Sequence, residues 1–308
     1  MAALTMFFFN VIMILHTVFR TVLPINPLCG TQRGCFSVKK YEIGVMFGCF
    51  RQEFDEGLET ARNIGATKLQ VGWGWKDLPA EEQKEILRRI QSHGLGVSAV
   101  CASLDGIHSG DMSVIEDAKK SIDLALNLGT NVVTSHIGVI PEEHNEEWEK
   151  MASVARPIGE YAASVGARLA IETGPESPEV LADFIDSVCP EGLAANLDPA
   201  NLAMVGGFDP VKAVYTLGHR IAHTHAKDGI RLSGYTAAQL YGGLVNPGGY
   251  TYLEVPLGKG DVDFTKWIAA LKDVGFDGVL CIEREVGDNP VNDIKLAVDL
   301  LNNVMENL

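Results

Sequence analysis

Short apolar segments, rich in β-branched residues, recur along the chain from residue 43 onward. Each is nearly continuous in hydrophobicity, which is typical of parallel strands that are covered on both faces. The predicted strands are 43–50, 67–73, 97–103, 131–138, 167–173, 193–199, 221–228 and 278–285. The pattern therefore predicts a parallel sheet rather than alternating, half-exposed strands.

Segments with a helical period separate these strands. The segment 80–93 is amphipathic and stops at Gly94, a residue suited to the position just after a helix. Ser113 and Glu116 have the spacing of a capping box, in which each side chain bonds the other's backbone N–H. The predicted helices are 54–64, 80–93, 113–127, 142–165, 178–188, 210–217, 263–274 and 291–304.

Strands and helices that alternate in this number indicate an α/β fold, a single-domain (β/α)8 TIM barrel. An open doubly wound sheet is the alternative, but no GxGxxG sequence follows the first strand. One connection, residues 229–261 after the seventh strand, is unusually long and rich in Gly and Tyr. At the carboxyl ends of the strands such a loop serves as a lid or substrate wall, or else as an oligomer contact.

Residues 1–40 do not share the alternation. The stretch 6–15 is strongly apolar, but it is short for a membrane span, and no basic residue precedes it as in a signal peptide. We expect residues 1–40 to be an N-terminal extension outside the fold and residues 41–308 to be the barrel domain. A signal or membrane anchor in the extension is the alternative.

The composition indicates which partners and which cellular compartment to expect. Asp and Glu number 40 against 25 Lys and Arg, a net charge of −15 that repels phosphate backbones. We therefore expect no nucleic-acid partner, and an anionic substrate only if the pocket is locally positive. The cysteines form no CxxC pair, and Cys49, Cys101 and Cys281 fall in apolar runs. Reduced, buried thiols of this kind favour a cytoplasmic protein, with a catalytic cysteine as the alternative.

Ionisable residues stand where the later strands end. Because the carboxyl ends of barrel strands meet at one mouth, the side chains expected there are His136, Glu172, Asp198, His225 and Glu283. Three carboxylates crowded together repel one another unless a cation neutralises them. Oxygen ligands with one nitrogen suit Mn²⁺ best, and also Mg²⁺, Co²⁺ or Zn²⁺. The sequence thus predicts a divalent-metal site.

Each of these residues also has a purely structural interpretation. A single Glu or Asp at a strand end is often a helix cap, and Asp198 before Pro199 is suited to shaping a turn. His223 and His225 share one face because side chains alternate along a strand, and one histidine there is often a hydrogen-bonded core residue. The coincidence of ligand-type residues at successive strand ends favours the metal site.

Four segments of the sequence resemble those of a known family. The segments 171–173 (IET), 197–202 (LDPANL), 223–228 (HTHAKD) and 281–285 (CIERE) are similar to those of the xylose isomerase-like TIM-barrel superfamily. The nearest branch contains sugar phosphate isomerases/epimerases and ketose 3-epimerases. The resemblance runs from about residue 40 to the carboxyl terminus.

The resemblance implies a division of roles among these residues. Glu172, Asp198, His225 and Glu283 match the four metal ligands, and Glu172 and Glu283 match the pair that moves protons on opposite faces of the sugar. Arg231 matches a substrate-binding arginine of the ketose 3-epimerases. Those epimerases often carry a histidine three residues after the aspartate, where this chain has Asn201.

The implied reaction is abstraction of a proton next to a sugar carbonyl. One glutamate removes the proton to give a cis-enediolate, and the other returns it to the opposite face or the adjacent carbon. Substrate oxygens are expected to contact Lys227, Arg284 and His136, although Lys227 is also placed to pair with Asp228 or Glu285. Two tryptophans, Trp73 and Trp75, either stack on the sugar or pack at the rim.

Three other functions compete with this one. A DNA-repair endonuclease of the same superfamily needs a further Asp-x-His, whereas residues 229–261 contain no histidine. A dehydratase of an inosose-type keto-cyclitol needs the same metal and the same first step, and is the main alternative. A non-catalytic sugar-binding barrel does not require two opposed glutamates. The sequence does not identify the sugar or show whether it is phosphorylated, and a homo-oligomer is possible. The glycines around Lys259 form either a turn or a phosphate-binding loop.

Overall fold

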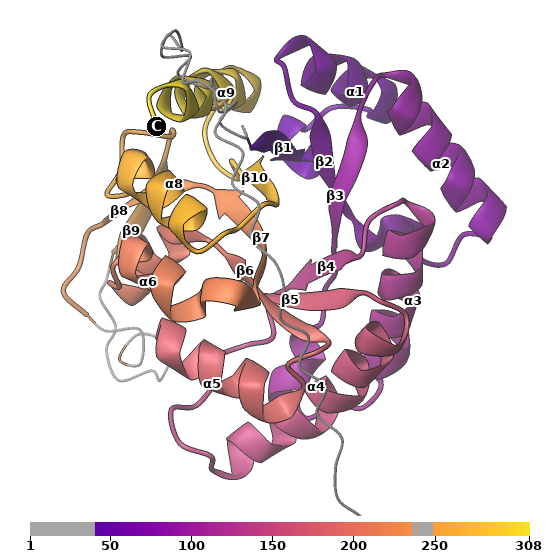
Figure 1. Cartoon of the computed structure of the whole chain (residues 1–308), viewed down its shortest axis with the longest axis vertical. Helices are drawn as coiled ribbons and strands as arrows, with labels where there is room; N and C mark the ends of the chain where they lie inside the picture. Colours follow the sequence, from indigo (N-terminus) through magenta and orange to yellow (C-terminus); the bar gives the residue numbers. More distant parts are fainter. Residues whose placement is uncertain (1–40, 236–238, 240–248) are drawn as a thin grey trace, which may run out of the picture. The chain divides into compact units, whose positions relative to one another are not determined.

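Eight parallel strands close into a barrel in the computed structural model, which describes residues 41–235, 239 and 249–308 (Figure 1). The strands are β1 (Glu42–Met46), β2 (Lys68–Gly72), β3 (Gly96–Cys101), β4 (Val132–Ser135), β5 (Arg168–Glu172), β6 (Leu193–Leu197), β7 (Ile221–Ala226) and β10 (Val279–Ile282). Closure comes from β1, which pairs with β10 on one side and β2 on the other. The predicted (β/α)8 barrel is confirmed.

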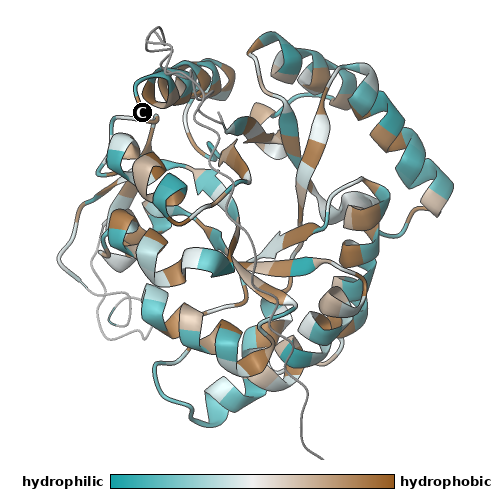
Figure 2. Ribbon diagram, viewed as in Figure 1, coloured by the Kyte–Doolittle hydropathy of each residue, from teal (hydrophilic) through white to brown (hydrophobic). Residues whose placement is uncertain are grey.

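Helices cover the outside of the barrel. They are α1 (Phe54–Asn63), α2 (Ala80–Ser92), α3 (Val114–Asn127), α4 (Glu146–Ser164), α5 (Pro178–Val188), α6 (Pro210–Leu217), α8 (Phe264–Asp273) and α9 (Pro290–Glu306). Hydrophobic positions gather on one face of many of these helices and hydrophilic positions on the other (Figure 2). The main core lies between helices and strands, where Leu69, Ile171, Phe184 and Trp267 are fully buried. Burial of both strand faces explains the continuous apolar runs.

One predicted helix cap and one predicted helix start are wrong in detail, although α3 does begin after Ser113 as expected. Ser113 makes no capping hydrogen bond, because its backbone is already helical; instead its N–H donates to Asp111. Helix α4 begins at residue 146 rather than 142, because the side chain of Asn145 accepts hydrogen bonds from the N–H groups of Glu147 and Trp148. A side-chain oxygen at this position satisfies the donors that a helix start leaves free.

The long connection after β7 contains a second, two-stranded sheet that the sequence analysis missed. Strand β8 (Asp228–Arg231) pairs antiparallel with β9 (Tyr252–Val255). The predicted strand 221–228 is therefore two strands. The carboxylate of Asp228 accepts N–H groups of Gly229, Gly258, Gly260 and Val262 and so holds both ends of the connection together. The glycines around Lys259 thus bind a carboxylate of the chain itself.

Expectations about the N-terminal extension lie outside the described residues, because these begin at residue 41. Within the described part of the chain, no helix combines the length and the hydrophobicity needed to cross a bilayer. The cytoplasmic compartment stays a prediction.

Candidate metal centre and substrate pocket

Four buried side chains meet at the carboxyl end of the barrel: Glu172 at the end of β5, Asp198 after β6, His225 in β7 and Glu283 after β10. One potential ligand atom from each lies within 4.8 Å of the others. We call these residues the ligand cluster. The neighbouring strands β5, β6, β7 and β10 supply one member each.

Alternation along each strand explains why these side chains face the same space. In β5, Leu169 and Ile171 pack in the core beneath the helices, whereas Ala170 belongs to a separate small cluster inside the barrel. Successive side chains point to opposite faces, so Glu172 shares the inner face with Ala170. Strand β10 repeats the pattern, with Leu280 and Ile282 in the main core and Glu283 next on the inner side.

The two oxygens of Asp198 have different surroundings. Its Oδ1 accepts the N–H groups of Ala200 (2.8 Å) and Asn201 (2.9 Å) and so shapes the turn into the π-helix Asn201–Gly206. Its Oδ2 is buried without a hydrogen-bond partner among the described residues and lies 3.4 Å from His225 Nδ1. Turn formation and ligation are therefore compatible in this residue, one oxygen for each.

The imidazole of His225 is oriented by the barrel interior. Gln70 donates from Nε2 to Thr134 Oγ1 (2.8 Å), which turns Gln70 Oε1 toward His225 Nε2 at 2.9 Å. The shorter bond to Gln70 Oε1 favours a proton on Nε2 over the longer contact of Nε2 with Asn196 Nδ2 (3.3 Å), and Nδ1 faces oxygens of Glu172, Asp198 and Glu283 at 3.3–3.4 Å. Nδ1 has no hydrogen-bond partner among the described residues. A nitrogen opposite three carboxylates requires a proton or a metal ion between them, and the donor set of three oxygens and one nitrogen fits a divalent metal.

The charges of the site reinforce this requirement. Burial opposes the charged form of His225, but the negative charges of Glu283 and Glu172 outweigh burial and raise its pKa well above the usual value. Burial likewise raises the pKa of Glu283, but the positive charges of His225 and Lys227 outweigh it and lower the pKa to about 2. The pocket therefore attracts positive charge to the position of Nδ1 and keeps Glu283 ionised.

A layer of buried polar side chains lies beneath and beside the cluster, and the sequence analysis missed two of its members, Gln70 and Asn196. Asn201 Nδ2 donates to Glu172 Oε1 at 3.0 Å, and Asn196 bridges Glu172 Oε2 (3.4 Å) and His223 Nδ1 (3.0 Å). His223 does not reach the cavity; burial and the charge of His225 lower its pKa to about 3, so it is neutral. The sequence feature that could have revealed this layer is a polar residue within an apolar strand segment, such as Gln70.

Lys227 connects the ligand cluster to a second group of buried charges. Its Nζ donates to Glu283 Oε2 (2.9 Å) and to Glu285, and lies 3.8 Å from Glu254 Oε2. Of the two pairings expected for Lys227, the one with Glu285 forms, whereas the Asp228 carboxylate is taken by backbone N–H groups. Arg284 donates to Glu254 Oε1 (2.7 Å) and to Asp293 Oδ2 (2.9 Å). We call Arg284, Glu254 and Asp293 the arginine cluster.

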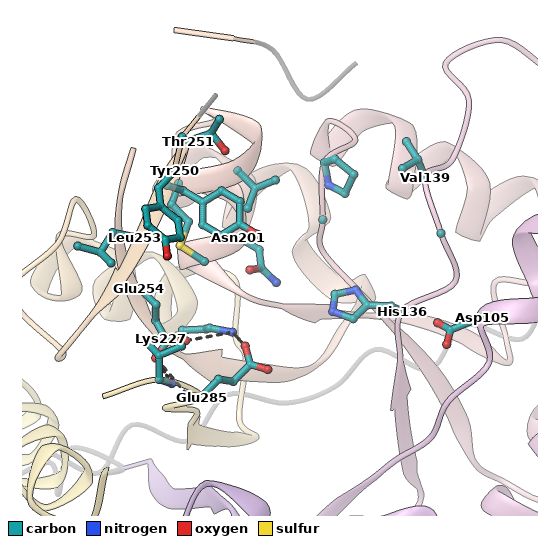
Figure 3. A pocket seen from close by; sticks show the side chains of 18 residues that line it. Asp105, His136, Val139, Asn201, Lys227, Tyr250, Thr251, Leu253, Glu254 and Glu285 are labelled. Carbon is teal, nitrogen blue, oxygen red and sulfur yellow. Dashed lines mark hydrogen bonds and ion pairs between the residues drawn. The ribbon is translucent and has the colours of Figure 1, made fainter. Parts of the chain in front are cut away.

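A cavity of about 1000 Å³ opens beside the ligand cluster, and Figure 3 shows its wall. Lys227, Glu254 and Glu285 lie on one side and His136 on the other. His136 Nε2 is 3.4 Å from Glu172 Oε1. Burial lowers its pKa, but contact with Glu172 and the nearby carboxylates outweigh burial and raise the pKa to about 9.

Several predicted substrate contacts are not brought to this cavity. Arg231 donates to the backbone carbonyls of Val205 and Ser233, both at 3.0 Å, and of Tyr235. The guanidinium of Arg284 is committed to the arginine cluster. Trp73, 41% exposed, is outside the set of described lining residues, and the Trp75 ring packs edge-on against Phe54. Of the substrate contacts expected from the sequence, His136 and Lys227 line the cavity.

The sequence of the chain is similar to a known family and to individual curated proteins. A family model described as xylose isomerase-like TIM barrel matches residues 58–304. An uncharacterized protein of Methanocaldococcus jannaschii is 25% identical over 183 residues, 56% of either chain. An inosose dehydratase of Clostridium botulinum is 29% identical over 165 residues, 50% of this chain and 53% of that protein. The chain thus spans just over half the length of these curated relatives.

Solved structures share the fold over most of the chain. A xylose isomerase domain protein of Planctomyces limnophilus is 24% identical, with a TM-score of 0.71 over 87% of this chain and 98% of that one. A D-psicose 3-epimerase of Clostridium cellulolyticum is 12% identical, with a TM-score of 0.65 over 86% of this chain and 99% of that one.

Proposed function

Because the chain belongs to the xylose isomerase-like TIM-barrel family, we propose that it is a divalent-metal-dependent sugar isomerase or epimerase. The observation that supports this most directly is the pair of unsatisfied atoms, Asp198 Oδ2 and His225 Nδ1, that face each other at 3.4 Å among carboxylates. Buried polar atoms without partners are costly unless they bind something.

Glu172, Asp198, His225 and Glu283 would hold the ion, with Mn²⁺ the favoured metal and Mg²⁺, Co²⁺ or Zn²⁺ as substitutes. Bound there, the metal supplies Lewis-acid stabilisation of the negative charge that develops on a substrate oxygen. Gln70 and Asn201 orient His225 and Glu172 from behind by hydrogen bonds. Such supporting bonds fix the direction in which a ligand presents its lone pair.

Glu172 and Glu283 move the proton in this proposal. They stand on β5 and after β10, and β6 and β7 separate these strands in the barrel, so the two carboxylates approach a bound sugar from different directions. One carboxylate accepts the proton next to the carbonyl, and the other returns a proton to the opposite face or to the adjacent carbon. Lys227 donates to Glu283 Oε2 and so restrains the rotation of that side chain.

A metal assay followed by a substrate screen tests the proposal. The purified protein, loaded with Mn²⁺, is incubated with a panel of ketoses and keto-cyclitols in deuterated water. We expect one bound ion per chain, lost in Asp198→Asn, and deuterium at the carbon next to the carbonyl of at least one substrate. A protein that binds the metal but exchanges no proton in any of them would contradict the proposed reaction.

A second candidate is the dehydration of an inosose-type keto-cyclitol, which the match to inosose dehydratase supports. Dehydration begins with the same proton abstraction and then expels a hydroxyl group from the neighbouring carbon. Mass spectrometry of the products separates the two reactions. Epimerisation or isomerisation preserves the substrate mass apart from deuterium, whereas dehydration removes one water and forms an unsaturated ketone.

A further inference from the structure

Both cationic groups in the described wall of the cavity, Lys227 and His136, are paired with carboxylates, and His136 Nε2 lies 3.4 Å from Glu172 Oε1. Lys227 is the one Lys or Arg among its described lining residues, and its Nζ is held by Glu283 (2.9 Å) and Glu285. Three acidic residues, Asp105, Glu254 and Glu285, also line the cavity. An anionic substrate would therefore meet a wall with three acidic side chains and two cations that are already paired with carboxylates.

Cationic side chains near the mouth are likewise committed elsewhere. Arg51 donates to the backbone carbonyls of Glu285 (2.6 Å) and Gly287 (3.0 Å). Arg231 binds backbone carbonyls, and Arg284 binds Glu254 and Asp293. The sequence of the long connection from residue 232 to residue 253 contains no Lys, Arg or His. It therefore supplies no positively charged side chain.

Peptide N–H groups at a glycine-rich turn are the usual substitute for a cation in phosphate binding. Here the N–H groups of Gly258 and Gly260 donate to the Asp228 carboxylate at 2.8 and 2.9 Å. That turn is filled by an anion of the chain itself and is not available to a substrate phosphate.

The rim of the cavity is apolar and exposed. Val139 follows β4, Tyr250 and Leu253 belong to the long connection, and Val286 follows β10; they are 43%, 90%, 47% and 45% exposed, respectively. Figure 3 shows Tyr250 and Leu253 across the cavity from Val139. Exposed apolar residues are ordinary when scattered, but a group around one pocket marks a binding surface.

The size of the cavity agrees with a substrate that reaches this rim. Its volume of about 1000 Å³ lies at the top of the range of roughly 300–1,000 Å³ typical of pockets for drug-sized ligands. A single sugar ring bound at the ligand cluster would leave much of this space to water.

We propose that the substrate is an uncharged keto sugar or keto-cyclitol joined to an apolar group, such as a glycoside with an apolar aglycone. The proposal rests on the proposed function, because the carbonyl end is assigned to the ligand cluster. Its uncharged polyol part occupies the acidic inner wall, where carboxylates accept hydrogen bonds from hydroxyl groups. Its apolar group contacts Val139, Leu253 and Val286 at the rim.

Binding of unreactive glycosides tests this inference without requiring turnover. Calorimetry with the Mn²⁺-loaded protein compares phenyl β-D-glucoside, methyl β-D-glucoside and methyl β-D-glucoside 6-phosphate. We expect the phenyl glycoside to bind about tenfold more tightly than the methyl glycoside, since burial of a ring is favourable, and the phosphate to bind at least about tenfold more weakly. Equal affinities, a preference for the phosphate, or no binding at all would overturn the inference.

Matched variants identify the residues responsible. Leu253→Ser is expected to remove most of the advantage of the phenyl glycoside, whereas Leu296→Ser, a similarly exposed position on α9, is expected to preserve it.

Glu285→Gln removes a partner of Lys227 and is expected to strengthen phosphate binding; Glu59→Gln on α1 gives the same change in net charge away from the cavity. If Leu253→Ser changes the oligomeric state but not glycoside binding, the rim joins copies of the chain and the inference is wrong.

Deuterium exchange distinguishes failure of the proposed reaction from failure of the proposed substrate class. Failure of exchange with every keto substrate contradicts the proposed function, whereas the order of the glycoside affinities decides the substrate class.

Discussion

Two groups of buried charges lie on either side of Lys227, and they are satisfied in different ways. In the arginine cluster, Glu254 Oε1 accepts Arg284 Nη1 and the N–H of Glu285, and Asp293 accepts Arg284 Nε. In the ligand cluster, Asp198 Oδ2 and His225 Nδ1 have no hydrogen-bond partner among the described residues. A buried cluster whose donors and acceptors match is structural, whereas one with excess acceptors is a site for a ligand.

The largest effect is expected from Glu283→Gln, which removes a base of the ligand cluster. We expect deuterium exchange to fall by about 10²–10⁴-fold, because general-base catalysis contributes that much. The measurement is exchange into the best substrate of the screen, followed by NMR. Glu59→Gln, an exposed position on α1, is the control. Exchange at the full rate in Glu283→Gln would show that this glutamate is not the base.

Arg284→Met breaks the arginine cluster instead. It leaves the Glu254 and Asp293 carboxylates without their guanidinium partner, and loss of one member of a buried ion pair costs about 3–5 kcal/mol. Urea unfolding measures the change, with Arg88→Met as the control, because Arg88 forms an exposed pair worth about 0–1 kcal/mol. Similar costs for the two variants would mean that the arginine cluster does not stabilise the fold.

Metal binding at the ligand cluster is expected to stabilise the folded protein against unfolding by mass action. At a free Mn²⁺ concentration of 100 times the dissociation constant, the free energy of unfolding rises by about 2.7 kcal/mol. A chelator is expected to reverse this increase in the free energy of unfolding. Asp198→Asn, which alters a proposed ligand, is expected to show little of the increase. Thermal unfolding with and without Mn²⁺ gives the result. Equal stabilisation of the wild type and Asp198→Asn would place the ion elsewhere.

The smallest predicted effect concerns Glu176, a buried carboxyl in neither cluster. Burial raises its pKa to about 7, against the opposing effect of backbone hydrogen bonds. The folded state therefore binds more protons than the unfolded state between the usual value of 4.5 and about 7, so stability falls as the pH rises through this window. Glu176→Gln removes that loss, which is at most about 3 kcal/mol above pH 7 for a shift from 4.5 to about 7.

Unfolding at pH 4 and pH 8 measures the contrast. The variant and the wild type are expected to have similar stability at pH 4, where the carboxyl is protonated in both states, and the variant is expected to be more stable at pH 8. A variant that is less stable at both values would show that Glu176 is held by bonds specific to its carboxylate.

The barrel could be predicted from the sequence because each of its elements has a local signature. Apolar runs mark strands covered on both faces, and the rule that strand ends converge brings Glu172, Asp198, His225 and Glu283 together. Interactions that join distant segments have no such signature. The β8–β9 pair unites segments on either side of a glycine-rich stretch, and Arg231 binds backbone carbonyls, which no residue pattern specifies. The substrate contacts were correspondingly the least predictable part of the site.

The hydrogen bonds of Asp228 have a consequence for how this protein can diverge. One carboxylate closes the base of the connection between β7 and α8, which ties both ends of the connection to the barrel at one point. The length and composition of the connection can drift while the strands that carry the ligand cluster stay unchanged. Exchange of this segment between homologous barrels is therefore a direct route to new substrate selectivity with the same chemistry.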